Sequence, residues 1–233
     1  MIVCLLVCLL VLGGTAIETA AADQANIMWG ACHYRSIKYQ KCDSPDWPKV
    51  QRRIDERMPA GLKYVGEPWH CPTQWQLPYM FENVDTFVVV RNPYERVVSE
   101  YYCSSYGYKG PNPDLVETFN HWVYGNVTEV TRALHGHMLP QAYYVYDENG
   151  NKIIDHVIRY ENLSAEFDAL MVEYGLPIKL PSKKEGIPMF HTYNRKGVSH
   201  SQQMTVNELS PENIAKINEV YARDFELFGY RIL

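Results

Sequence analysis

The sequence predicts an α/β fold with a central, mainly parallel sheet. A strand is predicted at residues 84–90, because they end in the apolar run Phe87-Val88-Val89-Val90, which is typical of a strand buried on both faces. An amphipathic helix is predicted directly after it, over residues 94–106. A later strand over residues 153–160 is likewise followed by a helix from Ser164. Strands that alternate with helices along one chain favour parallel βαβ units.

The other elements follow from hydrophobic periodicity and turn residues. A short strand is predicted at residues 63–66, and residues 143–146 are predicted to form a strand that an Asn-Gly turn joins to the one at 153–160. The last helix has Ser210 as its N-cap and ends at Gly229. Further helices are predicted at residues 16–29, 48–58 and 115–124.

Length and composition fit one domain and restrict its partners. Of 233 residues, 46% are hydrophobic and 21% are charged, which allows a sizeable core. The net charge of −5 argues against a general polyanion-binding surface, so we expect no nucleic-acid partner. The 18 tyrosines suit either carbohydrate contacts or a tyrosine-rich core.

The apolar run at residues 2–12 supports two incompatible interpretations. It is too short to span a bilayer comfortably but fits the apolar region of a signal peptide, and it would allow membrane association. Alternatively it is the first buried strand, and Gly13, Gly14 and Thr15 form a phosphate-binding loop that opens a helix. Cleavage after Ala22 would remove that loop.

Cysteines and sequons favour the secretory pathway. Four of the six cysteines lie outside the apolar run and could form two disulfides, whose pairing the sequence leaves open. Asn126 and Asn162 begin N-glycosylation sequons. No Cys-x-x-Cys spacing occurs, so we expect no metal centre. No Gly-x-x-x-x-Gly-Lys-[Ser/Thr] motif occurs either, which argues against a P-loop kinase.

Arg91 and Ser99 are the leading candidates for ligand binding. Arg91 follows the buried strand at its carboxyl end, where open α/β sheets bind their ligands. Its guanidinium offers a fixed fork of donors that suits a phosphate. Ser99 comes eight residues later, in the second turn of the helix, and offers a hydroxyl. The alternative is an ordinary strand-to-helix turn with a surface arginine.

Four stretches, in order, resemble the Golgi carbohydrate sulfotransferases that use 3′-phosphoadenosine 5′-phosphosulfate (PAPS). The first of them resembles the 3′-phosphate-binding motif of that family. The four stretches are residues 90–99, 137–147, 157–163 and 221–230. The resemblance is nearest to the heparan and uronyl 2-O-sulfotransferases. It implies a three-layer, P-loop NTPase-like sandwich, with a sulfotransferase domain at residues 13–233 after an apolar segment at 1–12.

The resemblance also implies an activity and roles for individual residues. A sulfuryl group would pass from PAPS to a hydroxyl of a carbohydrate acceptor in the Golgi lumen or at its membrane. His70 precedes Arg91 by 21 residues, as the catalytic histidine of uronyl-type enzymes does, and is the expected base. The alternative is that His70 is a loop residue that packs beside Trp69. Lys196 is expected to reach a cofactor phosphate, and Ser99 to bind the 3′-phosphate with Arg91.

The first loop departs from the family pattern, which usually reads Pro-Lys-x-Gly-x-Thr. Residues 10–15 keep the glycine and threonine but carry Val11 where the family has its lysine. That lysine stabilises charge on the transferred group, and losing such a donor typically costs several kcal/mol of barrier. Three explanations of the missing lysine are open. The original N-terminus has been replaced by a different first segment, another cation takes the place of the lysine, or the protein binds nucleotide or glycan without turnover.

Overall fold

The computed structural model describes residues 6–8, 14–25, 47–58, 63–65, 71–103, 107–130, 133–180 and 203–233. The strands are β1 (Leu6–Cys8), β2 (Lys63–Val65), β3 (Thr86–Val90), β4 (Ala133–His135) and β5 (His156–Arg159). The α-helices are α1 (Gly14–Ala25), α2 (Trp47–Arg57), α3 (Pro93–Cys103), α4 (Leu115–Glu129), α5 (Ala142–Val145), α6 (Leu163–Glu173), α7 (Pro211–Val220) and α8 (Ala222–Phe228). Short 3₁₀ helices are η2 (Thr73–Trp75), η3 (Pro78–Phe81), η4 (Tyr160–Asn162) and η7 (Val206–Glu208).

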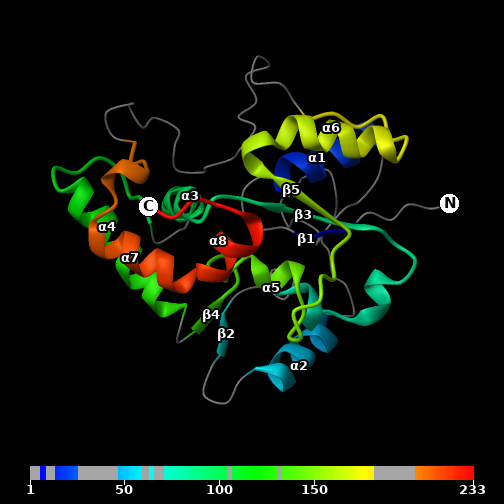
Figure 1. Ribbon diagram of the computed structural model, residues 1–233, viewed down its shortest axis with the longest axis horizontal. Coiled ribbons are helices and arrows are strands. Elements are labelled where there is room, and N and C mark those ends of the chain that lie inside the picture. The colour runs from blue at the N-terminus through cyan, green and yellow to red at the C-terminus, as the bar shows by residue number, and fades with distance from the viewer. Residues whose placement is uncertain are drawn as a thin grey trace.

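Among these residues, the strands form two parallel sheets (Figure 1). In the first, the order is β1-β3-β5, and β3 is paired on both sides. Its register joins Phe87 to Val7 on one side and to His156 on the other. β2 and β4 form the second sheet. The predicted α/β class with a parallel sheet is therefore confirmed.

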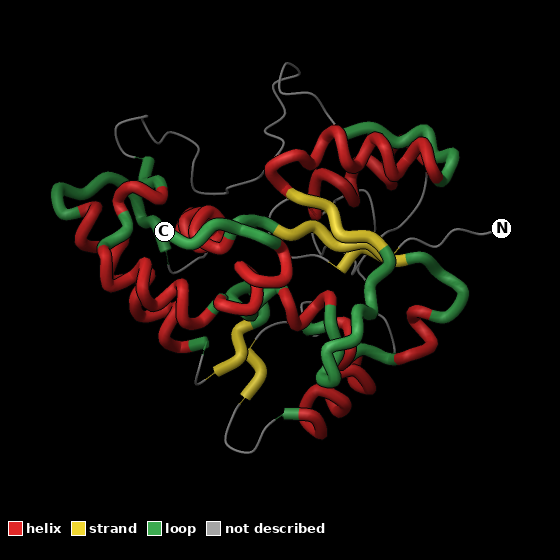
Figure 2. The backbone as a smooth tube through the Cα atoms, viewed as in Figure 1, coloured by secondary structure: helices red, strands yellow, loops and turns green. Residues whose placement is uncertain are grey.

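Helices cover both faces of the first sheet, as a three-layer sandwich requires (Figure 2). All five residues of β3 are buried. Phe87 and Val89 pack with α1 and α6, whereas Val88 and Val90 pack with α2, α5 and α8. This division follows from the alternation of side chains along a strand.

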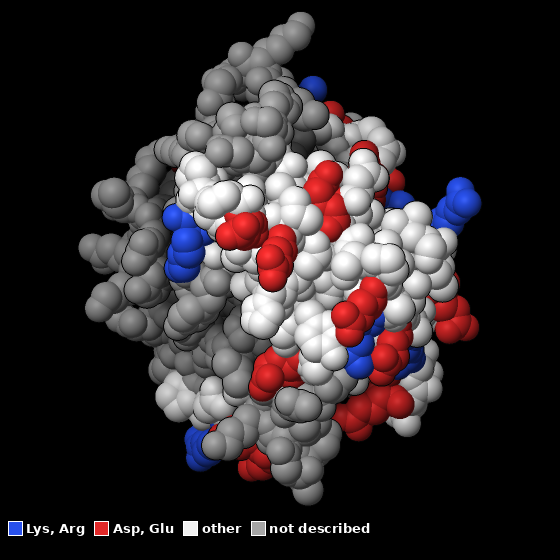
Figure 3. Space-filling view, turned by 90° about the vertical axis from the view of Figure 1, so that its left-hand side faces the viewer, with Lys and Arg blue, Asp and Glu red and all other residues white. Residues whose placement is uncertain are grey.

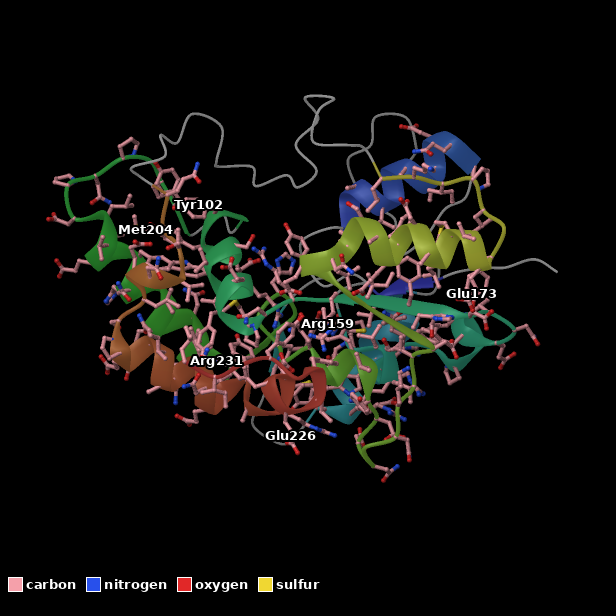
Figure 4. All side chains as sticks on the ribbon, turned by 45° about the horizontal axis from the view of Figure 1, so that its top comes forward. Tyr102, Arg159, Glu173, Met204, Glu226 and Arg231 are labelled. Carbon is pink, nitrogen blue, oxygen red and sulfur yellow. The ribbon has the colours of Figure 1, made fainter. Side chains whose placement is uncertain are left out.

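A helical lobe continues from the sheet. α3 is buried over most of its surface and packs with α4, α7 and α8 around an aromatic cluster. The Tyr101 ring lies 5.0 Å from that of Phe119 and 5.3 Å from that of Trp122. At the end of the lobe, the backbone N–H of Met204 donates to the Tyr102 hydroxyl at 2.6 Å (Figure 4). The high tyrosine content therefore serves the core at several positions.

The strand predicted at residues 143–146 is wrong, because these residues lie in and just after the short helix α5. Buried Asp224 accepts the backbone N–H groups of Gln141 and Ala142 at 2.8 Å each, which stabilises the start of a helix. The Asn-Gly turn does form, and only an isolated antiparallel bridge between Tyr146 and Lys152 flanks it.

The single helix predicted before Gly229 is also wrong, because it breaks at Tyr221 into α7 and α8. Its ends are as predicted: the Ser210 hydroxyl accepts from the Asn213 N–H, and Gly229 adopts a left-handed φ of 62°. The Tyr221 hydroxyl donates to the carbonyl of Met138 at 2.8 Å, so the break coincides with a buried anchor.

Other boundaries differ by a few residues. α4 continues to Glu129, past the predicted end, while residues 26–29 and 104–106 of two predicted helices lie outside the described residues. β1 pairs with β3 as the strand interpretation of the apolar run expects, and the division at residue 12 stays a prediction. No described helix is both long enough and apolar enough to cross a membrane. Cys32 and Cys42 lie outside the described residues, so the disulfide pairing stays open.

Candidate active site

Arg91 lies at the carboxyl edge of the first sheet. Val90, the last residue of β3, pairs with Arg159, the last residue of β5, so the residues that follow both strands emerge together. The guanidinium carbon of Arg91 lies 4.2 Å from the ring centroid of Tyr160. Its side chain is only 16% exposed. The cation–π contact and the burial hold the guanidinium at the edge where α/β sheets bind ligands.

A carboxylate already pairs with Arg91. Its Nη2 lies 3.1 Å from Oε2 of Glu95, which is four residues later, in the first turn of α3. Glu95 is half exposed, so water screens the pair. A phosphate group at this position would compete with Glu95 for the same donors.

The turn between β3 and α3 is fixed through its backbone. The Arg91 N–H donates to Oε1 of Gln141 at 2.8 Å, and the Arg91 carbonyl accepts from Nε2 of Gln141 at 2.8 Å. The N–H of Asn92 donates to Oε1 of Glu161 at 2.7 Å. Oδ1 of Asn92 accepts from the N–H of Tyr94 at 3.0 Å, which caps α3.

Ser99 lies on a strongly polar part of buried α3. It is 3% exposed, and its neighbours Arg96 and Glu100 are buried as well. Nη2 of Arg96 donates to the carbonyl of His137 at 2.6 Å, and Nδ1 of His137 lies 3.2 Å from Oε1 of Glu100. These groups anchor α3 to the segment that follows β4.

Two acids, buried Asp224 and exposed Glu161, support the turn from behind. Asp224 is fully buried, and burial raises its pKa although the nearby Arg96 acts to lower it. The Tyr230 hydroxyl donates to Oε2 of Glu161 at 3.1 Å. Burial, and then the Glu161 carboxylate, raise the pKa of Tyr230, so its hydroxyl remains a donor at neutral pH.

Arg159 has structural partners. Its backbone N–H donates to Oε2 of Glu166 at 2.6 Å, and Nη2 donates to the carbonyl of Phe228. Its guanidinium lies 5.2 Å from the ring centroid of Tyr230, near the middle of the molecule (Figure 4). It therefore ties β5 to the end of α8.

The predicted first loop begins a helix as expected. α1 starts at Gly14, with Thr15 next, and β1 precedes it beside β3. Because neighbouring parallel strands end at the same edge, the chain leaves β1 on the side where Arg91 lies. Gly13, His70 and Lys196 lie outside the described residues, so their roles stay predictions. Within the described ranges, no cluster of three or more His, Cys, Asp or Glu could hold a metal ion.

The sequence reasoning missed the residues that support Arg91. Gln141 contacts Arg91 from 50 residues away along the chain, and Glu161 contacts the adjacent Asn92 from 69 residues away. No local pattern reveals such contacts. Asp224 did leave a signal. It falls on the buried face of its helix, between Tyr221 and Phe228, where an acid needs a specific partner.

The three layers and the Arg91 turn define an α/β protein with a basic side chain at the ligand-binding edge of a parallel sheet. Residues 25–231 match the profile described as the sulfotransferase family. The chain therefore belongs to the sulfotransferase family, whose chemistry is sulfuryl transfer. This match starts at Ala25, the last residue of α1, so it leaves out the first loop and includes the segment that contains Arg91. No curated protein and no solved structure matches the chain significantly.

Proposed function

We propose that this chain transfers a sulfuryl group from PAPS to a hydroxyl of a carbohydrate acceptor, and that Arg91 binds the 3′-phosphate of the cofactor. The position of Arg91 carries the proposal: a largely buried guanidinium, stacked on Tyr160, directly after the central strand. A guanidinium stays charged at any physiological pH and offers paired donors to phosphate oxygens.

Other residues complete the proposed cofactor site. The Ser99 hydroxyl is the proposed second ligand of the 3′-phosphate, on the helix that Arg91 introduces. The start of α1, with Gly13, Gly14 and Thr15, is proposed to hold the 5′-phosphosulfate through backbone N–H groups. Lys196 is proposed to add a positive charge. The cofactor supplies the sulfuryl group, and these residues orient it.

His70 is the proposed base that accepts the proton of the acceptor hydroxyl. A neutral imidazole suits this step because its ordinary pKa lies near neutrality. In sequence, His70 follows the end of β2 by five residues. The family resemblance supports this role.

The carbohydrate acceptor and the Golgi location rest on sequence features and the surface. Asn162 is exposed, and its Nδ2 makes only a long hydrogen bond of 3.4 Å to Oε1 of Glu166. Asn126 is half buried, and its Nδ2 donates to the carbonyl of Trp122 at 2.8 Å. Asn162 is therefore the better proposed glycan site. On the face that carries α4 and α7, acidic and basic groups are interspersed among the described residues, and acidic groups cover more of it than basic ones (Figure 3).

A second candidate function is a sulfotransferase-fold protein that binds nucleotide or glycan without turnover. Val11, where the family carries a lysine, favours it. Binding and turnover separate the two candidates, because the loss of a donor to developing charge slows transfer more than it weakens binding.

The test is calorimetric titration of adenosine 3′,5′-bisphosphate into the full chain. Arg91→Ala should weaken binding about 30-fold, the equivalent of about 2 kcal/mol for hydrogen bonds to a charged group. Arg52→Ala, which removes an exposed arginine on α2, serves as the matched control and should bind as the wild type does. Unchanged affinity in a folded Arg91→Ala variant, or displacement by ATP, would contradict the proposal.

Transfer is then measured with radiolabelled PAPS and a panel of glycans. Labelled glycan supports the enzyme. Binding that depends on Arg91, without label on any acceptor, supports the second candidate.

A further inference from the structure

The side-chain amide of Gln141 pairs with the backbone of Arg91 as a neighbouring strand would. Beyond Val90, the ladder with β5 ends, and the backbone groups of Arg91 need new partners. The side-chain amide of Gln141 supplies both: Oε1 accepts the Arg91 N–H, and Nε2 donates to the Arg91 carbonyl, each at 2.8 Å. This paired exchange is the pattern between opposed residues of a sheet. Arg91 is therefore held as though the sheet continued.

Asp224 fixes the amide that does this. Gln141 is 1% exposed and Asp224 is 0% exposed, so water does not compete with their contacts. Oδ2 of Asp224 accepts the Gln141 backbone N–H at 2.8 Å and its Nε2 at 3.4 Å. Oδ1 accepts the Ala142 N–H at 2.8 Å. One carboxylate thus sets both the backbone and the side chain of Gln141.

Arg91 is consequently restrained from two sides. Gln141 holds its backbone from the side of α5 and α8, while Tyr160 and Glu95 contact its guanidinium at the sheet edge. A bidentate contact needs the guanidinium in one orientation, and a backbone free to rotate would lose that orientation.

We propose that Gln141, held by Asp224, is a positioning residue that orients Arg91 toward the 3′-phosphate of the nucleotide. The inference rests on the proposed function, because it assigns Gln141 to the same site. Gln141 itself touches no ligand in this arrangement and acts only through Arg91.

The test compares two nucleotides that differ only in the 3′-phosphate. Adenosine 3′,5′-bisphosphate and adenosine 5′-monophosphate are titrated into the full chain, and the ratio of their dissociation constants measures recognition of the 3′-phosphate. Gln141→Met keeps the length of the side chain and removes its hydrogen bonds. It should reduce the ratio tenfold or more, while the affinity for the monophosphate changes less than threefold.

Tyr144→Phe is the matched control. It removes a buried hydrogen bond from the Tyr144 hydroxyl to the Gly136 carbonyl at 2.7 Å, on the helix that Gln141 introduces. It should leave the ratio unchanged. Gln141→Asn and Asp224→Asn repeat the measurement with polar side chains, in case the methionine variant does not fold, and both should reduce the ratio.

The double variant Arg91→Ala/Gln141→Met gives the decisive comparison. If Gln141 acts through Arg91, the second substitution adds no further loss of the ratio. Equal weakening of both nucleotides in the Gln141 variants, or losses that add in the double variant, would overturn the inference and leave the proposed function intact. A wild-type protein with no preference for the 3′-phosphate would instead overturn the proposed function, and the inference with it.

Discussion

Nη2 of Arg91 and Oε2 of Glu95 lie 3.1 Å apart, so a carboxylate stands beside the guanidinium that is proposed to bind the phosphate. The pair spans four residues from the end of β3 into α3. Binding of a phosphate would have to displace or repel this carboxylate.

Glu95→Gln should therefore strengthen binding of adenosine 3′,5′-bisphosphate. We expect about threefold tighter binding, because an exposed ion pair is typically worth less than ~1 kcal/mol. The gain should shrink at high salt, since added ions screen the repulsion. Calorimetry at two ionic strengths measures both effects. Glu117→Gln, which neutralises an exposed acid on α4, is the control, and equal affinities for the two variants would show that Glu95 does not compete with phosphate.

The hydrogen bonds between Thr86 and Asp155 should make the stability of the fold depend on pH. Burial acts to raise the pKa of Asp155, but hydrogen bonds from the Thr86 hydroxyl and N–H, at 2.7 and 2.8 Å, leave that pKa below its ordinary value. A carboxyl group with a lowered folded-state pKa stabilises the fold above its ordinary pKa. This stabilisation is lost as the pH falls through the folded-state pKa.

Thr86→Val should lower the free energy of unfolding by about 1 kcal/mol near neutral pH, because it removes the hydroxyl partner of Asp155. The difference from wild type should narrow as the pH falls below about 4, the ordinary range of an aspartate. Urea unfolding of both proteins, from neutral pH to below about 4, measures this difference in the free energy of unfolding. Thr86→Ser keeps the hydroxyl and should retain the wild-type pH dependence; a Thr86→Val deficit that is constant with pH would count against this account.

Two glycines should respond to alanine in opposite directions. A Cβ atom at Gly107 would lie 1.9 Å from the carbonyl oxygen of Tyr101, and the neighbouring N–H of Tyr108 donates to that same oxygen. Gly107→Ala must therefore shift the backbone, and we expect a loss of more than ~2 kcal/mol. Gly125 lies exposed within α4, where an added Cβ would meet nothing within 4 Å apart from its chain neighbours and the backbone of its own helix.

Gly125→Ala should raise the free energy of unfolding by about 0.5–1 kcal/mol, because alanine favours the helix. Thermal unfolding of both variants and the wild type shows whether each substitution raises or lowers the stability. A stabilised Gly107→Ala variant would show that residues 107–110 can move without cost.

The parts of this fold that the sequence predicts well are those with local signals. The apolar run before Arg91 and the capped helix after it needed only neighbouring residues, and both form. α5 was predicted as a strand because Tyr143 and Tyr144 favour strands by composition. A carboxylate 83 residues away, on Asp224, stabilises its helical start instead. The support of Arg91 by Gln141 escaped prediction for the same reason, since only the folded chain brings them together.

The burial of β3 on both faces leaves its register poorly defined by hydrophobicity alone. Val88, Val89 and Val90 are all buried, so a shift by one residue would still place apolar side chains on both faces of the sheet. The polar groups at the strand's end distinguish these alternatives, because Gln141 can pair with only one residue at a time. During folding, the paired hydrogen bonds of the Gln141 amide would therefore favour the register in which Arg91 lies at the sheet edge.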